Sequence, residues 1–338
     1  MSMQWFPGHM KQARRAMAEA LPSNDVVIEV LDARMPISSS NPVLSKLRAQ
    51  KPCIKLLGKT DLADPEITRA WVDHFASQAE SQVVALLFSK DRAGEARARI
   101  TELCRKLAPK RVQSARPVRV MVVGIPNVGK STLINLLMER KVAKVSDQPG
   151  VTRAPQLVTL KTGLTLLDNA GILWPRIDTE SVLRLSLGGA LPEAEMDYET
   201  VAAFAAQFLS KHYPKRLAAR LAIPELPSSS ELVLEAIARK YGCLRKGGQF
   251  DWRRASEILV HEFRSGVFGR VSLETPADLA ARELTAIGEA AMADATSPEV
   301  RDNEEPSEAP PTGFASTAHS VVTHDRVSDP KDEDPTPD

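Results

Sequence analysis

A glycine-rich motif constrains the fold of this chain more than any other feature of its sequence. The residues Gly124–Ser131, GIPNVGKS, follow an apolar run at Val118–Val123 and precede a helical pattern at Thr132–Glu139. Strand, loop and helix in this order are the context that a GxxxxGK[ST] phosphate loop requires. The glycines let backbone N–H groups turn inward around phosphates, and the helix N-terminus adds partial positive charge. The motif therefore predicts a nucleotide site on an α/β sheet.

Each side chain of this loop has an expected partner on a nucleotide. Lys130 is expected to reach the β- and γ-phosphates during catalysis, and the Ser131 hydroxyl is expected to coordinate Mg²⁺. The rest of the predicted phosphate cradle consists of Asn127, Val128, Gly129 and Thr132.

Two further motifs follow in the order that a phosphate-loop NTPase needs. Asp168 ends the apolar run LTLLD, where it is expected to hold Mg²⁺, and the Gly171 N–H is expected to meet the γ-phosphate. Thr152, in PGVTR, is expected to supply a second hydroxyl to the metal and to take part in catalysis.

The element expected to recognise the base lies upstream of the phosphate loop. The run KPCIKLLGKTDL ends with Gly58, Lys59, Thr60 and Asp61. The Asp61 carboxylate can accept from both donors of a guanine edge, and Lys59 can lie against the ring, whereas adenine presents the wrong groups. The next apolar run ends at Phe88 and Ser89, where a backbone N–H can meet the guanine carbonyl oxygen.

The base motif precedes the phosphate motif, so the predicted fold is an α/β, doubly wound domain with a circularly permuted motif order. The five apolar runs at 25–34, 51–62, 81–90, 118–124 and 164–171 alternate with helical patterns, which predicts a parallel sheet covered on both faces. Permutation keeps the site, because ligands gather at the carboxyl ends of parallel strands however those strands are connected.

The composition predicts four segments. Residues 1–22 form a basic and aromatic lead, residues 23–178 the nucleotide-binding domain, residues 179–290 an all-helical domain, and residues 291–338 an acidic tail. The tail holds seven prolines and few large apolar residues, so disorder is expected.

The net charge of +1 conceals an asymmetry. From residue 291 onward the chain has 12 acidic and 3 basic residues, which leaves an excess of ten positive charges on the body. A basic body predicts an anionic partner.

The sequence argues against a Cys-x-x-Cys metal protein and against a membrane-spanning protein. The three cysteines, Cys53, Cys104 and Cys243, are too far apart for a Cys-x-x-Cys metal site and are expected to be small core residues in a reducing cytoplasm. The longest apolar stretch, near Val201–Leu209, is too short to cross a bilayer, so no membrane insertion is expected.

These motifs resemble those of the circularly permuted GTPases, and among them the ribosome biogenesis GTPase A family. The resemblance covers roughly residues 3–276 and is carried by WFPGHM (Trp5–Met10), VLDARMPISSSNP (Val30–Pro42), GIPNVGKSTLIN (Gly124–Asn135), QPGVT (Gln148–Thr152), DNAGILWP (Asp168–Pro175) and LEAIARKYGCLRKGG with FRSGVFGRVSLE (within Leu234–Glu274).

The resemblance implies a P-loop GTPase that converts GTP to GDP and phosphate with Mg²⁺. It also implies binding to rRNA on the large (50S) ribosomal subunit at a late assembly step, stimulation by that subunit, release after hydrolysis, and a monomer off the ribosome. Asn127 resembles an asparagine that coordinates K⁺ in related GTPases; the alternative is a hydrogen bond to backbone.

Two departures from the family pattern, and one difference from many other GTPases, affect the expected chemistry. Gly58 replaces the usual Asn, which predicts weaker nucleotide affinity, and Asn169-Ala170 replace Thr-Pro. Ile172 stands where many GTPases have a water-orienting Gln. His9 is the candidate for a catalytic group acting in its place; the alternatives are a cap on the following helix or a contact with a partner.

The basic helical region is the expected RNA interface. Ala236–Ser272 contain eight basic and three acidic residues. Tyr241, Phe250 and Trp252 lie among them and are available either for stacking on bases or for the apolar core. A second functional hypothesis is a nucleotide-gated RNA-binding scaffold with negligible turnover. A metabolic kinase is a distant third, since no acceptor-substrate site is recognisable.

Overall fold

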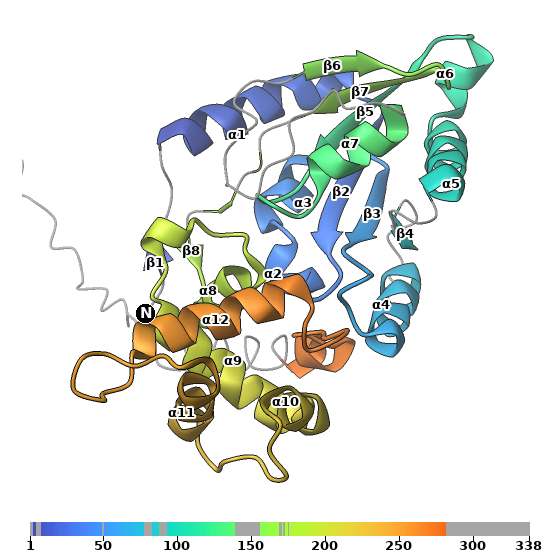
Figure 1. Cartoon of the computed structure of the whole chain (residues 1–338). Coiled ribbons are helices and arrows are strands. Elements are labelled where there is room, and N and C mark those ends of the chain that lie inside the picture. The colour runs from blue at the N-terminus through green and yellow to red at the C-terminus, as the bar shows by residue number, and fades with distance from the viewer. Residues whose placement is uncertain are drawn as a thin grey trace, which may run out of the picture. The chain divides into compact units, whose positions relative to one another are not determined.

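The five apolar runs predicted as strands join one sheet in the computed structural model, which describes residues 3–4, 8–48, 51–77, 83–87, 93–138, 156–168, 171, 173–174 and 176–281 (Figure 1). The strands of this sheet are β2 (Val26–Asp32), β3 (Cys53–Gly58), β4 (Val83–Leu87), β5 (Val118–Val123), β6 (Gln156–Thr159) and β7 (Leu164–Asp168). A separate ladder pairs β1 (Met3–Gln4) with β8 (Arg176–Ile177). Met1–Gly288 form one compact unit and Glu289–Asp338 form a second. The prediction that the tail is disordered applies to residues outside the described ranges.

The strand order is β4-β3-β2-β5-β7-β6, and the first five of these strands run parallel to their neighbours. β6 is antiparallel to β7, so the sheet is mixed, and this sixth strand is not among the five parallel strands that the sequence predicts. The reason is local: a tight turn, in which Leu160 N donates to Leu164 O and Gly163 N to Leu160 O, folds the chain directly back. QLVT is too short and too exposed to give a strong strand pattern.

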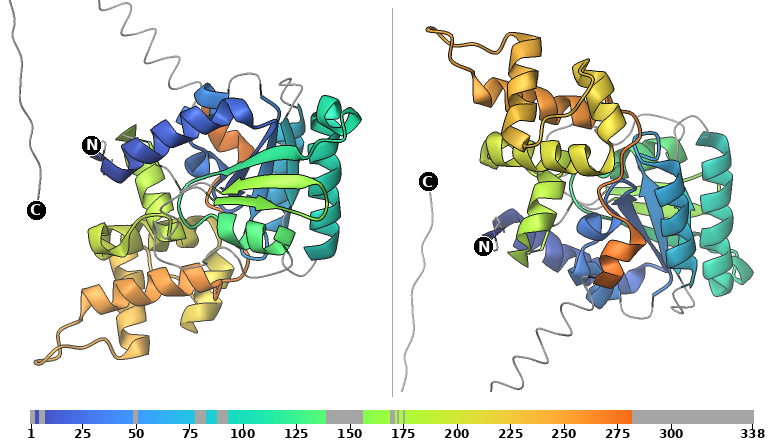
Figure 2. Two further views of the ribbon diagram at one scale, coloured as in Figure 1. Left: turned by 90° about the horizontal axis from the view of Figure 1, so that it is seen from above. Right: turned by 90° about the horizontal axis from the view of Figure 1, so that it is seen from below.

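Helices cover both faces of the sheet (Figure 2). The α-helices of the nucleotide-binding part are α1 (Gly8–Ala20), α2 (Pro36–Ser39), α3 (Pro42–Arg48), α4 (Pro65–Ser77), α5 (Ala93–Leu107), α6 (Pro109–Gln113) and α7 (Lys130–Met138), with a 3₁₀ turn at Leu21–Ser23. Alternate residues of β2 face opposite ways: Val27 packs with α1 and α3, whereas Ile28 packs with α5 and α7. The parallel strands are therefore buried on both sides, as their apolar runs predict.

Residues 179–265 are mainly helical and form the helical part of the protein. It contains α8 (Thr179–Gly188), α9 (Tyr198–His212), α10 (Pro214–Leu221), α11 (Ser230–Tyr241) and α12 (Trp252–Ser265), with a 3₁₀ turn at Glu193–Glu195. Side-chain caps set the helix starts: Asp178 accepts from Ser181 N, and Asp251 accepts from Arg254 N. α9 and α12 pack along each other, with α8, α10 and α11 around them (Figure 1).

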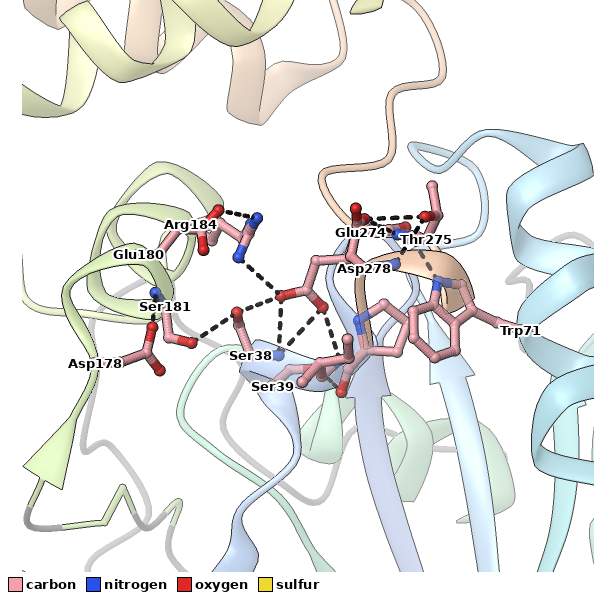
Figure 3. A network of polar contacts seen from close by, with 12 residues as sticks. Ser38, Ser39, Trp71, Asp178, Glu180, Ser181, Arg184, Glu274, Thr275 and Asp278 are labelled. Atoms are coloured by element: carbon pink, nitrogen blue, oxygen red, sulfur yellow. Dashed lines mark hydrogen bonds and ion pairs between the residues drawn. The ribbon is translucent and has the colours of Figure 1, made fainter. Parts of the chain in front are cut away.

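An irregular strap after α12 returns to the sheet, where the sequence predicts helix instead. Val271 N donates to Leu62 O, and Trp71 Nε1 donates to Glu274 O at 3.1 Å. The Glu274 carboxylate lies between α2 and α8, where it accepts from Ile37 N at 2.7 Å and from the N–H and hydroxyl of Ser38 (Figure 3). Burial raises the pKa of Glu274 to about 7, against these hydrogen bonds. The carboxyl end of the helical part is thus attached to the loop after β3, to α4 and to α2.

The three cysteines are buried and free, which confirms their expected place in the core. Burial raises the pKa values of Cys53 and Cys104 to about 12. None of the helices in the described ranges combines the length and the apolar character needed to cross a bilayer.

Leu166, fully buried in β7, provides a test of the sheet core. Leu166→Ala is expected to lower the free energy of unfolding by about 2–5 kcal/mol, because the lost methyl groups leave a cavity. The matched control is Leu157→Ala on the neighbouring β6, where the side chain is 71% exposed and a change within about 0.5 kcal/mol is expected. Urea denaturation measures both, and equal losses would contradict the assigned register.

Candidate nucleotide-binding site

Four parallel strands end at one edge of the sheet, and each carries a candidate site residue at or near its end. Asp32 is paired with Gly58 across β2 and β3, and Val122 is paired with Asp168 across β5 and β7. The phosphate loop leaves β5 between these two pairs. The base, phosphate and metal motifs, which are far apart in sequence, are therefore brought to one place.

The phosphate loop is shaped by close backbone approaches. A Cβ on Gly124 would lie 2.6 Å from Val30 O, so only glycine fits against β2. Asn127 has a φ of 58° and Gly129 a φ of 105°, both in the left-handed region. Asn127 Nδ2 donates to Gly189 O at 2.9 Å, beyond the end of α8. That bond is the backbone contact foreseen as the alternative for Asn127.

Lys130 lies at the start of α7 with its side chain turned into the loop. Its Nζ donates to Ile125 O at 2.7 Å, and the residue is 7% exposed. Burial lowers the pKa of Lys130 to about 8, against the attraction of Asp168. An anionic ligand in the loop would raise this pKa again, so the lysine is suited to a phosphate group. Ser131 and Thr132 occupy the same first turn of α7 and are half-buried.

The chemistry of Asp168 fits a metal ligand. The residue is 2% exposed, and its Oδ1 has no hydrogen-bond partner among the described residues. Burial raises the pKa of Asp168 to about 6, against the opposing effect of Lys130. A buried carboxylate oxygen that lacks a donor is suited to a hard divalent cation, and Ser131, which can supply a hydroxyl ligand, lies in the first turn of α7. The residues present therefore fit Mg²⁺.

Gly171 lies directly against the phosphate loop. A Cβ at this position would be 2.7 Å from Pro126 N and 2.9 Å from Lys130 Nζ. The backbone at Gly171 therefore lies beside the lysine that is expected to hold the terminal phosphates.

The base motif follows β3 and contacts the phosphate loop. A Cβ added to Gly58 would lie 3.1 Å from Val128 O, so this departure from the family pattern is located at the contact between the two loops. Lys59 has a φ of 56°, and its Nζ pairs with Asp32 Oδ2 at 3.0 Å. Asp61 is exposed beyond this pair, and Thr60 is half-buried.

Sequence reasoning assigned no role to Asp32 and Arg34. Asp32 accepts from Arg34 Nε at 3.0 Å and from Nη2 at 2.8 Å, and both side chains are buried. Burial alone would raise the pKa of Asp32, but the charges of Arg34 and Lys59 outweigh it and hold the pKa well below its usual range. The available signal was two opposite charges, separated by one alanine, at the end of an apolar strand.

Some predicted site residues lie outside the described residues. These are Phe88, Ser89, Thr152, the Asn169-Ala170 pair and Ile172. The backbone of His9 belongs to the first turn of α1, and its side chain lies outside the description.

Comparisons with known proteins agree with this geometry. A family model described as 50S ribosome-binding GTPase matches residues 119–207. Ribosome biogenesis GTPase A of Bacillus cereus is 39% identical over 284 residues, covering 82% of this chain and 95% of the relative. The chain belongs to the ribosome biogenesis GTPase A family. The member from Thermotoga maritima is 34% identical, with 82% of this chain and 96% of the relative covered.

A solved member of the family shares the fold. The GDP-bound YlqF structure aligns with a TM-score of 0.56 and 31% identity, covering 78% of this chain and all of that one. As in the other ribosome biogenesis GTPase A members, the chain thus carries an α/β P-loop GTPase fold and the family's GTP-binding motifs.

Asp168 makes the proposed metal binding depend on pH. Because its pKa is raised to about 6, the carboxyl is protonated below that pH and cannot ligate Mg²⁺. The gain in GDP affinity caused by Mg²⁺ is therefore expected to grow between pH 5 and pH 7.5. Fluorescent-nucleotide titrations with and without Mg²⁺ measure this gain.

Two variants separate the effect from protonation of the nucleotide itself. Asp168→Asn is expected to abolish the pH-dependent part of the gain. Asp178→Asn, which changes the N-cap of α8 to another good cap, is expected to retain it. A gain that rises equally in wild type and Asp168→Asn would contradict the role of Asp168.

Proposed function

We propose that this protein is a GTP-hydrolysing assembly factor that binds rRNA, acts at a late step of large-subunit assembly in the cytoplasm, and leaves after hydrolysis. The observation that carries the proposal is the convergence of the phosphate loop, Asp168 and the Gly58–Asp61 segment at one sheet edge. Support for the biological setting comes from relatives named as ribosome biogenesis GTPases, including a mitochondrial ribosome-associated GTPase 1 from Mus musculus at 34% identity.

In this proposal the sheet edge binds guanine at one end and phosphates at the other, so that the motif order is circularly permuted while the site is retained. Asp61, exposed after β3, accepts from the guanine Watson–Crick edge, and Phe88 and Ser89 supply the backbone for its carbonyl oxygen. Lys59 covers the ring while Asp32 holds its ammonium group. The preference for guanine follows from the acceptor-only chemistry of an ionised carboxylate.

In this proposal the phosphate loop and Lys130 bind the phosphates. Lys130 exchanges Ile125 O for the β- and γ-phosphates, and the N–H groups of Val128, Gly129 and Thr132 surround them. Ser131, Thr152 and Asp168 would hold Mg²⁺, and the bound ion would supply positive charge that offsets charge on the transferred phosphate. Gly171, whose backbone lies beside Lys130, would contact the γ-phosphate and so sense its loss.

The group that positions the attacking water is proposed to be His9, because Ile172 can neither donate nor accept. A K⁺ ion at Asn127 also stays a proposal. The amide nitrogen of Asn127 contacts Gly189 O, so the ion would be bound through the amide oxygen. The monomeric state off the ribosome likewise remains a prediction.

The helical part is proposed to contact rRNA, and its aromatic residues lie in different surroundings. Tyr241 donates its hydroxyl to Glu262 at 2.6 Å, and Phe250 packs against the core. Trp252 is 39% exposed, which favours it as the residue that stacks on a base. Arg264 is turned inward onto α8, so it does not belong to the expected RNA-binding set.

Binding to large subunits tests the function directly. We expect co-sedimentation with a non-hydrolysable GTP analogue, weaker co-sedimentation with GDP, steep loss with added salt, and GTP turnover stimulated by the subunits. Replacing the exposed Lys246 and Arg254 by Ala is expected to weaken association several-fold. The matched control replaces Lys106 and Arg116, exposed in the nucleotide-binding part, and is expected to have little effect.

Different outcomes separate the hypotheses. Nucleotide-dependent association without stimulated turnover would favour the RNA-binding scaffold. Association that is independent of nucleotide and salt would contradict both.

Base specificity is tested by Asp61→Asn. This change replaces one acceptor by a donor, so preference is expected to shift from GTP to XTP, whose base presents an oxygen where guanine has an amino group. Asp73→Asn, the same change at an exposed position on α4, is the matched control and should leave preference for GTP intact. Competition of both triphosphates against a fluorescent nucleotide measures the ratio, and an unaltered ratio in Asp61→Asn would remove Asp61 from the site.

A further inference from the structure

The carboxyl end of α8 is held by side chains from three separate parts of the chain. Four consecutive carbonyl oxygens accept hydrogen bonds from outside the helix, as follows: Ser186 from Arg264 Nη2 at 2.8 Å, Leu187 from Arg264 Nε at 3.3 Å, Gly188 from Arg34 Nη2 at 3.0 Å, and Gly189 from Asn127 Nδ2 at 2.9 Å. Arg264 belongs to α12, Arg34 follows β2, and Asn127 is in the phosphate loop. One helix end thus contacts both the helical part and the nucleotide site.

Arg34 extends this contact to the base motif. It pairs with Asp32 through two hydrogen bonds, and Asp32 Oδ2 in turn pairs with Lys59 Nζ at 3.0 Å. Asp32 is fully buried and Arg34 is 2% exposed, so neither charge is compensated by water. The position of Lys59 therefore depends on Arg34, and the position of Arg34 depends on the Gly188 carbonyl.

One glycine sets the end of this helix. Gly189 has a φ of 80°, which ends α8 in the left-handed conformation, and the preceding Gly188 adjoins the end of the Met35 side chain. Arg34 also lies over the Phe263 ring of α12, 5.5 Å from its centroid. A shift of α8 or α12 relative to the sheet therefore breaks contacts to both nucleotide loops.

We infer that the carboxyl end of α8 couples the helical part to guanine nucleotide binding, with Arg34 and Arg264 as positioning residues. Displacement of α12 withdraws Arg264 from α8, and displacement of α8 withdraws acceptors from Arg34 and Asn127, which loosens the base and phosphate loops together. The inference rests on the proposed nucleotide site. Coupling is reciprocal, so bound nucleotide must stabilise the end of α8 to the same extent.

Arg264→Gln tests the coupling from the side remote from the nucleotide. In the full-length protein this change is expected to raise the GDP Kd about fivefold or more, because α8 loses two capping bonds. Arg253→Gln is the matched control: it lies on the same helix, removes the same charge, and pairs with Glu257 at 2.5 Å instead of with α8. The GDP Kd of this control is expected to stay at the wild-type value.

Hydrogen exchange separates coupling from general destabilisation. The amides of Gly189 and Ala190 donate to Ser186 O and Leu185 O at the end of α8. GDP is expected to slow their exchange in the wild type, and Arg34→Gln is expected to abolish that slowing. A purely structural role would lower the melting temperature without removing the effect of nucleotide. If Arg34→Gln does not fold, Arg34→Lys and Arg264→Gln provide the same comparison.

The outcomes distinguish this inference from the function on which it rests. A wild-type protein that binds GDP, with an unchanged Kd in Arg264→Gln and unchanged protection of α8, would overturn the coupling alone. A wild-type protein that binds no guanine nucleotide would overturn the proposed function as well. A raised Kd in Arg264→Gln but not in Arg253→Gln, together with lost protection in Arg34→Gln, would support the coupling.

Discussion

The buried carboxylate of Asp32 is the interaction on which the arrangement of the site depends. A fully buried charge is costly unless cations and hydrogen-bond donors compensate it, and Asp32 has both in Arg34 and Lys59. Satisfying it fixes the turn after β2, the left-handed residue that begins the base loop, and the arginine that reaches α8. Two segments, the turn after β2 and the base loop, thus take their positions from one side chain, and α8 is linked to it through Arg34.

The edge of the sheet explains how the proposed, permuted order of motifs would still form one site. β2, β3, β5 and β7 run in parallel, so their carboxyl ends meet there whatever the order in which the chain visits them. The phosphate loop lies between the base motif and Asp168, and glycines at Gly124 and Gly171 permit backbone contacts that any side chain would block. A buried lysine and a buried aspartate then have pKa values shifted toward each other, which is typical of sites prepared for a charged ligand.

The helical part is joined to this edge through contacts that periodicity does not reveal. Amphipathic patterns predicted the helices, yet Arg264 looks the same in sequence as the other arginines of α12. Its inward turn onto the α8 carbonyls depends on the packing of two helices. The strap at Val271–Glu274 was equally hidden in the sequence, because its residues do not differ in type from those of the neighbouring helices. Its irregular path is set by hydrogen bonds to the loop after β3 and to Trp71.

The sequence by itself determined the five parallel strands, the phosphate loop, the nature of the candidate ligands and the family, because each depends on local patterns whose geometry is nearly fixed: apolar runs form buried strands, and a glycine-rich turn before a helix binds phosphate. Only the tertiary structure decided that β6 runs antiparallel to β7, that Asp32 pairs with both Arg34 and Lys59, and that Arg264 donates to the carbonyl oxygens at the end of α8. Those outcomes rest on pairs of residues up to 154 positions apart, such as Arg34 and Gly188, and the free energy of such contacts exists only when the chain has folded.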